Sequence, residues 1–176
     1  VGRLAVVTNI AGEGAPDPQR RSRGALVKDW LDGKGPEEGP EPATLDSYNP
    51  FNLLVLGQRG LFRLANRPQP VRIPLDAGLH SLSNGVVGAP WPRREQLEAA
   101  VATWLAEGID DPAALFEALA FDHWPAGTSA PDGAPPVFIR NPVYGTRCST
   151  VVAIDRDGGG WLAERRFDPA GRQSGE

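Results

Sequence analysis

Two groups of β-type segments, separated by two consecutive helix-type segments, restrict the fold class of this 176-residue chain. The first group is apolar or alternating and covers residues 4–8, 52–57, 61–66, 71–75 and 77–85. The second group has the same β-type composition and covers residues 137–140, 148–154 and 161–167. The glycine-bearing turns 58–60 and 155–160 join neighbouring segments and favour antiparallel pairing. We therefore expect an α+β fold with a largely antiparallel sheet system.

Three segments carry helix signals. Ser22 is a typical N-cap for a first helix, which Gly33 would end. A second helix is predicted from Pro92 to Gly108, because proline suits the first turn and glycine the end. Its apolar stripe consists of Leu97, Val101, Trp104 and Leu105. A third helix is predicted from residue 111 to Leu119, whereas the acidic, proline-bearing stretch 34–47 is expected on the surface.

Composition and charge exclude several classes of function. A net charge of −4 provides no basic footprint for nucleic acid, and no apolar run approaches the length of a membrane-spanning helix. The single cysteine excludes an intrachain disulfide and fits a reducing compartment, so we expect a cytoplasmic protein. The length allows one domain, predicted over residues 1–170, with a disordered tail at 171–176.

Several stretches together resemble the transport and Golgi organisation protein 2 family, which is also named after an Asn-Arg-Asp-Glu (NRDE) motif. They occur in order as GRLAVVTNI, RSRGALVKDWL, NPFNLLVL, GLHSLSNGVVGAPWPR and YGTRCSTVVAID. Family members begin with Met-Cys, followed by the Asn-Arg-Asp-Glu motif and a Gly-Gly-Thr-Trp segment, none of which occurs here. The resemblance therefore implies the C-terminal three-quarters of a family domain, incomplete at its N-terminus.

The resemblance also implies a fold and two alternative functions. The family looks related to N-terminal-nucleophile hydrolases, whose mostly antiparallel sheets form an αββα sandwich. One function is binding and trafficking of haem or of another hydrophobic or anionic metabolite, without catalysis. The alternative is an amide or ester hydrolase with an N-terminal cysteine nucleophile. Val1 has no nucleophilic side chain, so that cysteine would have to lie in a preceding segment. We favour the carrier.

Two asparagines and one arginine are the candidate supporting shell of such a site. Asn9 and Asn84 each follow a predicted strand, where a side-chain amide could serve as an oxyanion donor or could simply stabilise a turn. Thr8 and Ser83 are their neighbours. Arg147 precedes a predicted strand and could hold an anionic group, or form a surface ion pair. We expect Asn9, Asn84 and Arg147 to converge on one hollow.

The remaining candidates concern haem and the wall of the hollow. Haem accepts His, Cys or Tyr as axial ligand, which makes four residues candidates: His80, His123, Tyr144 and Cys148. Trp91, between two prolines, is a candidate wall residue.

The lone cysteine has two further interpretations. Strand alternation would place Cys148 on one face with Thr150 and Val152, so we expect a buried packing position. A nucleophilic thiol is the other alternative, although no histidine lies nearby in sequence. A missing edge strand would also leave a sheet edge through which two copies could form a homodimer.

Overall fold

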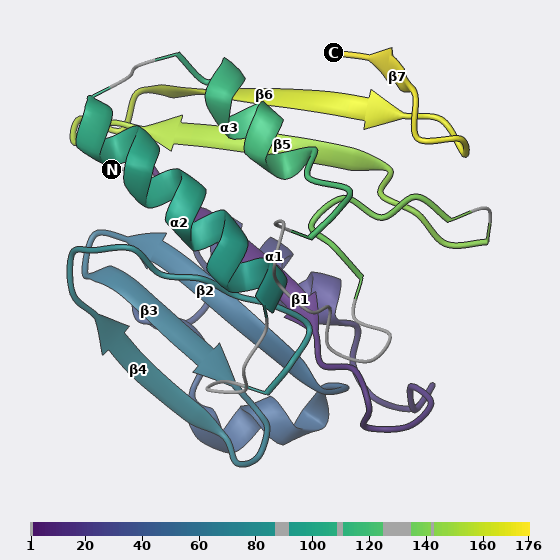
Figure 1. The fold of residues 1–176 in the computed structure, drawn as a ribbon. Coiled ribbons are helices and arrows are strands. Elements are labelled where there is room, and N and C mark those ends of the chain that lie inside the picture. The colour runs from purple at the N-terminus through teal and green to yellow at the C-terminus, as the bar shows by residue number, and fades with distance from the viewer. Residues whose placement is uncertain (1, 87–91, 109–110, 125–134, 142) are drawn as a thin grey trace. The chain divides into compact units, whose positions relative to one another are not determined.

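The computed structural model describes residues 2–86, 92–108, 111–124, 135–141 and 143–176, and confirms an α+β fold with two antiparallel sheets (Figure 1). The chain divides into two compact units, Val1–Pro90 with Arg156–Gly158, and Trp91–Asp155 with Gly159–Glu176. Each sheet belongs to one unit, and each unit is described by itself. The αββα sandwich would require the two sheets to stack face to face, and it stays a prediction.

The first unit is built on a four-stranded sheet in the order β1-β2-β3-β4. Its elements are β1 (Leu4–Asn9), α1 (Arg23–Leu31), the 3-10 helix η1 (Pro42–Ser47), β2 (Phe51–Gly57), β3 (Gly60–Ala65) and β4 (Val71–Leu75). Gly60 adopts a φ of 105°, which closes the predicted hairpin between β2 and β3. Pro74 lies in β4, where an edge strand tolerates a residue without an N–H group.

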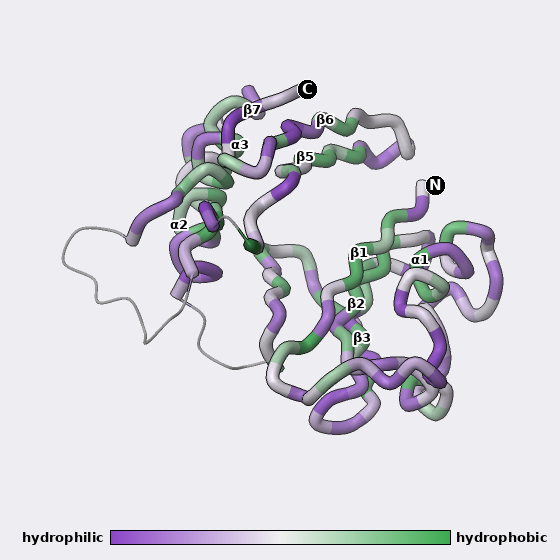
Figure 2. Tube along the Cα trace, turned by 90° about the vertical axis from the view of Figure 1, so that its right-hand side faces the viewer, coloured by the Kyte–Doolittle hydropathy of each residue, from purple (hydrophilic) through white to green (hydrophobic). Residues whose placement is uncertain are grey.

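Helix α1 contributes the largest side chain of the core. The Ser22 hydroxyl accepts a hydrogen bond from the Gly24 N–H group, as predicted for the N-cap. Leu26 and Trp30, one turn apart, are both buried against the sheet. The buried cluster contains Leu26, Trp30, Leu45, Tyr48, Phe51, Leu53, Val55 and Leu64. Figure 2 shows the hydrophobic runs of this unit in green along β1, β2 and β3.

The segment between α1 and β2 corrects one expectation. Residues 34–47 were predicted as a surface excursion, yet Leu45 is completely buried and Tyr48, just beyond the segment, is nearly so. Both side chains belong to the core cluster because η1 turns the chain back onto the sheet. Composition concealed this, since apolar residues are sparse among the acids and prolines of the segment.

The second unit contains a three-stranded sheet in the order β5-β6-β7 and two helices. Its elements are α2 (Pro92–Glu107), α3 (Ala113–Leu119), β5 (Cys148–Ile154), β6 (Gly160–Phe167) and β7 (Gln173–Gly175). Phe116 of α3 is buried, and the guanidinium carbon of Arg165 lies 4.3 Å from its ring centroid. The rings of Phe138 and Phe167 meet edge to face at 4.7 Å. Both predicted helices are confirmed, although Leu105 of the apolar stripe is exposed.

Three local expectations are wrong. Residues 77–85 and 137–140 form no strand. Side chains of the first sheet hold the backbone around residue 83 instead, and the Phe138 N–H group donates to the Phe121 carbonyl rather than to a strand. Within 171–176, expected to be disordered, β7 pairs with β6. Such short segments carry too little periodicity to predict which partner their backbone will find.

No helix in the described part of the chain is long and apolar enough to cross a membrane.

Gly57 provides the space that Trp30 occupies. A Cβ atom at residue 57 would lie 2.9 Å from the Cζ2 atom of the Trp30 ring. We predict that Gly57→Ala lowers the free energy of unfolding by about 1–3 kcal/mol through overpacking, measured by urea denaturation. Gly24→Ala is the matched control, because its Cβ would meet only the Ser22 Oγ atom at 3.5 Å. Equal stability of Gly57→Ala and the wild type would contradict this packing.

Candidate functional site

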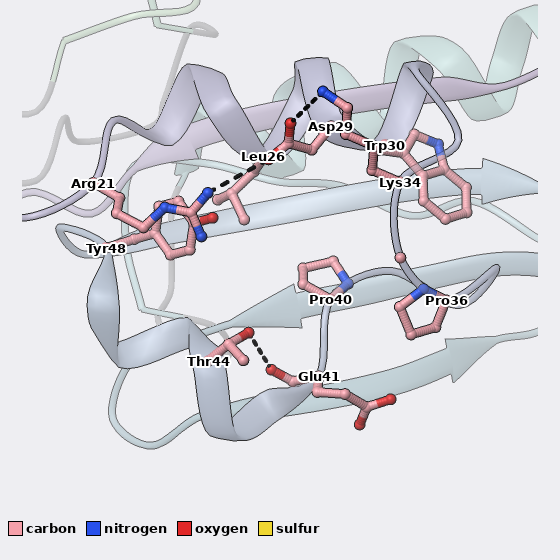
Figure 3. Close-up of a pocket in the computed structure, with 11 residues that line it drawn as sticks. Arg21, Leu26, Asp29, Trp30, Lys34, Pro36, Pro40, Glu41, Thr44 and Tyr48 are labelled. Atoms are coloured by element: carbon pink, nitrogen blue, oxygen red, sulfur yellow. Dashed lines mark hydrogen bonds and ion pairs between the residues drawn. The ribbon is translucent and has the colours of Figure 1, made fainter.

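A cavity of about 310 Å³ opens in the first unit between α1 and the segment that leads through η1 (Figure 3). The lining residues come from these two stretches of chain and are Arg21, Leu26, Asp29, Trp30, Lys34, Gly35, Pro36, Pro40, Glu41, Thr44 and Tyr48. The lining combines an apolar surface with two cationic side chains and two carboxylates. A volume of this size matches the lower range of small-molecule sites.

The apolar part of the cavity is rigidly supported. Leu26 and Trp30 are each only 2% exposed, and Figure 3 shows the Trp30 and Pro36 rings at one end of the cavity. Arg3 fixes Trp30 twice, because its guanidinium donates to the Trp30 carbonyl at 2.8 Å and its carbon lies 4.9 Å from the ring centroid. A ligand would therefore meet a preformed hydrophobic surface.

Three charged side chains of the lining form a chain, and Lys34 Nζ also lies 3.2 Å from Asp32, which is outside the lining. Asp29 Oδ2 lies 3.5 Å from Arg21 Nη2, and Asp29 Oδ1 lies 3.5 Å from Lys34 Nζ. Dashed lines mark both pairs in Figure 3. Arg21 also lies over the Tyr48 ring, 4.8 Å from its centroid. All three charged groups remain partly in contact with solvent, so their pairing is weak.

Neighbouring charges keep Lys34 protonated. The Asp32 carboxylate, and secondarily Asp29, raise the pKa of Lys34 above its ordinary value of 10.5. Hydrogen bonds from Lys28, and then from Lys34, lower the pKa of Asp32. Burial raises the pKa of Tyr48, so this phenol is neutral at physiological pH. The cavity thus offers permanent positive charge and a neutral hydroxyl.

One buried asparagine attaches η1 and Tyr48, which form one side of the cavity, to the sheet. Asn66 is completely buried. Its amide nitrogen donates to the carbonyls of Leu45 and Tyr48, at 3.1 Å each, and its amide oxygen accepts from the Phe51 N–H group at 3.0 Å. These bonds join η1, the start of β2 and the end of β3 in one network. Tyr48 therefore owes its position in the cavity to a residue outside the lining.

Asn9 and Asn84, two of the predicted site residues, lie side by side at the end of β1. Asn84 Nδ2 donates to Asn9 Oδ1 at 2.6 Å and approaches the Asn9 carbonyl at 3.3 Å. The predicted neighbours join them, since Thr8 Oγ1 donates to the Ser83 carbonyl at 3.0 Å. Asn9 and Asn84 are 75 positions apart in the sequence. The structure thus brings together four of the predicted site residues.

The missed member of this group is Asn52 on β2. It is 1% exposed and opposite Thr8 in the sheet. Its amide nitrogen donates to the Ser83 and Gly85 carbonyls, at 3.2 and 2.9 Å, while its buried amide oxygen has no hydrogen-bond partner among the described residues. A polar residue within an otherwise apolar strand was the available signal, because such a side chain must find a local partner.

The third member of the expected hollow, Arg147, belongs to the other unit. Its side chain is exposed and forms no ion pair with a described residue, while its carbonyl accepts from the Phe167 N–H group. Convergence of Arg147 with Asn9 and Asn84 stays a prediction. Tyr144, a predicted ligand residue, is 74% exposed.

Cys148 is exposed, so the predicted packing position is wrong. Strand alternation does hold along β5, but with the opposite face inward. Ser149 is the buried residue and lies opposite Arg165. Arg165 in turn contacts Phe116 of α3, so the helix covers the face that Ser149 shares and leaves Cys148 on the other.

The histidines lie outside the cavity. His80 is exposed, and its Nε2 atom lies 2.7 Å from the Asp76 carbonyl. His123 Nδ1 lies 3.1 Å from the carboxylate of its neighbour Asp122. Trp91, the predicted wall residue, lies outside the described residues. Among the described residues, no cluster of three His, Cys, Asp or Glu side chains could hold a metal ion.

The cavity itself was missed by sequence reasoning. None of its lining residues was a predicted site residue. The one available signal was the apolar pair Leu45 and Tyr48 near the end of an otherwise polar stretch. That pair indicates a segment that returns to the core, and a segment that leaves and returns can enclose space.

Comparison with protein-family models bears on the identity of the chain. The sequence model of the Transport and Golgi organisation 2 family matches residues 1–169, which confirms the resemblance read from the motifs. No curated protein matches the sequence. The match includes the cavity, the asparagine pair and β5 and β6 of the second sheet. That further family residues precede Val1 stays a prediction.

The role of Asn66 in holding η1 and Tyr48 beside the cavity can be tested by mutation. We predict that Asn66→Ala lowers the free energy of unfolding by about 2–4 kcal/mol, because the Phe51 N–H group loses a buried acceptor and the carbonyls of Leu45 and Tyr48 each lose a donor. Urea denaturation measures the loss. Asn49→Ala is the control, since Asn49 bonds the Asp17 backbone at the exposed surface and should cost far less. Similar costs for the two variants would show that the network is not the support.

Proposed function

The chain belongs to the Transport and Golgi organisation 2 family, and from this premise we propose that it binds and carries a small metabolite with an apolar body and an anionic group. The observation that carries the proposal is the cavity beside α1, where a rigid apolar wall adjoins Arg21 and Lys34. Apolar surface supplies affinity, and a few placed charges fix orientation. No step of bond making or breaking is needed for this role.

Haem is the cargo that the family resemblance suggests, and a cavity of about 310 Å³ would receive only part of it. Tyr48 is the one lining residue of a type that ligates haem iron. Burial raises the pKa of this phenol, which disfavours the phenolate that iron prefers. Haem would therefore be held here by its carboxylates and its flat ring rather than through iron. The exposed residues His80, His123, Tyr144 and Cys148 remain ligand candidates elsewhere on the surface.

Hydrolysis of amides or esters is the alternative, and the asparagine pair bears on it. The amide nitrogen of Asn84 donates to Asn9 Oδ1, so this donor is already engaged within the pair. The amide nitrogen of Asn9 has no hydrogen-bond partner among the described residues and is the donor that an oxyanion could use. A hydrolase would thus rely on Asn9 more than on Asn84. This alternative predicts turnover, whereas the carrier proposal predicts binding alone.

Lys34 offers a test of the carrier. We predict that the protein binds dodecanoate, and that Lys34→Gln weakens binding about fivefold, the scale of a partly exposed charge pair. Isothermal titration calorimetry measures both affinities. Lys28→Gln is the matched control, because Lys28 also pairs with Asp32 but does not line the cavity. It should leave the affinity unchanged.

Three further titrations separate the alternatives. Dodecyltrimethylammonium has the same chain with a cationic head and should bind more weakly than dodecanoate. Haemin tests the cargo directly, and a Soret spectrum unchanged by Tyr48→Phe would agree with binding that does not involve iron ligation by Tyr48. Absence of dodecanoate binding, or equal loss of affinity in the Lys34 and Lys28 variants, would reject this cavity as the site.

A further inference from the structure

The arrangement of Asp29 between two cations points to regulation of the proposed site, and the inference rests on the proposed function. We infer that Asp29 is an internal competitor that occupies the place of the ligand's anionic group. The ligand class that follows is a monocarboxylate with an apolar chain or ring. Its carboxylate would take over the contacts with Arg21 and Lys34 that Asp29 now makes.

The distances show that Asp29 is a weak occupant. Its two oxygens lie 3.5 Å from Arg21 and 3.5 Å from Lys34, whereas charge-assisted hydrogen bonds are typically 2.7–2.9 Å long. Within the same unit, the Arg3–Glu37 pair reaches 2.9 Å. Asp29 therefore bridges both cations without forming a close bond to either, and an incoming carboxylate has contacts to gain.

The charge balance of the cavity favours one further anionic group. Arg21 and Lys34 contribute two positive charges and Asp29 one negative charge, while Asp32, 3.2 Å from Lys34, also pairs with Lys28 outside the lining. The other lining carboxylate, Glu41, is engaged with Arg72 at 3.3 Å, and Arg72 lies outside the lining. Counted together, Arg21, Lys28 and Lys34 exceed Asp29 and Asp32 by one positive charge, which a ligand with one negative charge would balance. Repulsion between the Asp29 carboxylate and the carboxylate of the ligand would still oppose binding, because like charges close to each other are unfavourable.

The geometry of the cations selects a carboxylate. The planar Arg21 fork matches the two oxygens of a carboxylate, and Lys34 adds a point charge. Arg21 is held in orientation by its stacking on the Tyr48 ring. Beyond this head-group position, the apolar wall of Leu26, Trp30 and Pro36 would receive the hydrocarbon part of the ligand.

Removal of the Asp29 charge tests the inference. Asp29→Asn keeps the shape and is expected to tighten dodecanoate binding about threefold to tenfold by isothermal titration calorimetry. Dodecan-1-ol, which is neutral, should bind with unchanged affinity, and dodecyltrimethylammonium should bind more weakly. Adding Lys34→Gln to the same chain should remove most of the gain. Glu38→Gln is the control for net charge, since Glu38 pairs with Arg59 outside the cavity.

The possible results distinguish a failure of the competitor role of Asp29 from a failure of the proposed function. If the wild type does not bind dodecanoate, the proposed function itself fails. If the wild type binds but Asp29→Asn binds equally or more weakly, the competitor role fails while the binding site stands. An equal gain in Glu38→Gln would also overturn the inference, because the effect would then be one of net charge. Thermal unfolding verifies that each variant is folded, and Asp29→Ser serves as the second variant.

Discussion

The hydrogen bonds of Asn66 are the constraint on which the first unit depends. A buried amide has to satisfy its donors and its acceptor inside the protein, and Asn66 does so on the backbones of Leu45, Tyr48 and Phe51. The acidic, proline-bearing segment is thereby held against the sheet although it has few apolar residues of its own. The cavity exists because this segment is attached at its far end while α1 forms the opposite wall.

Two more polar side chains of the first unit donate hydrogen bonds to the backbone of other segments. Asn52 holds the backbone of Ser83 and Gly85, and Arg3 holds the carbonyl of Trp30. In each case a polar side chain of the sheet, or of the residues just before it, donates to backbone carbonyls outside the sheet. These contacts hold the irregular segments beside the cavity and the asparagine pair against regular elements of the first unit.

Sequence patterns predicted the regular elements well and the irregular ones poorly. The hairpin at Gly60, the N-cap at Ser22 and the helix from Pro92 all follow from local chemistry, and the structure confirms them. Asn9 and Asn84 were predicted to converge, and the structure joins them by a hydrogen bond that the sequence did not foresee. Cys148 was assigned the wrong face because alternation along a strand gives two faces without saying which one a helix will cover.

The sequence by itself determined the α+β class, the strand pairs joined by tight turns, and membership of the family, because each rests on local periodicity or on short motifs. Only the tertiary structure decided where the cavity lies, which residues line it and which strand face is buried. The physical reason is that a cavity is formed by segments distant in sequence, and their approach depends on buried hydrogen bonds such as those of Asn66. A single polar residue in the sequence does not reveal its partners.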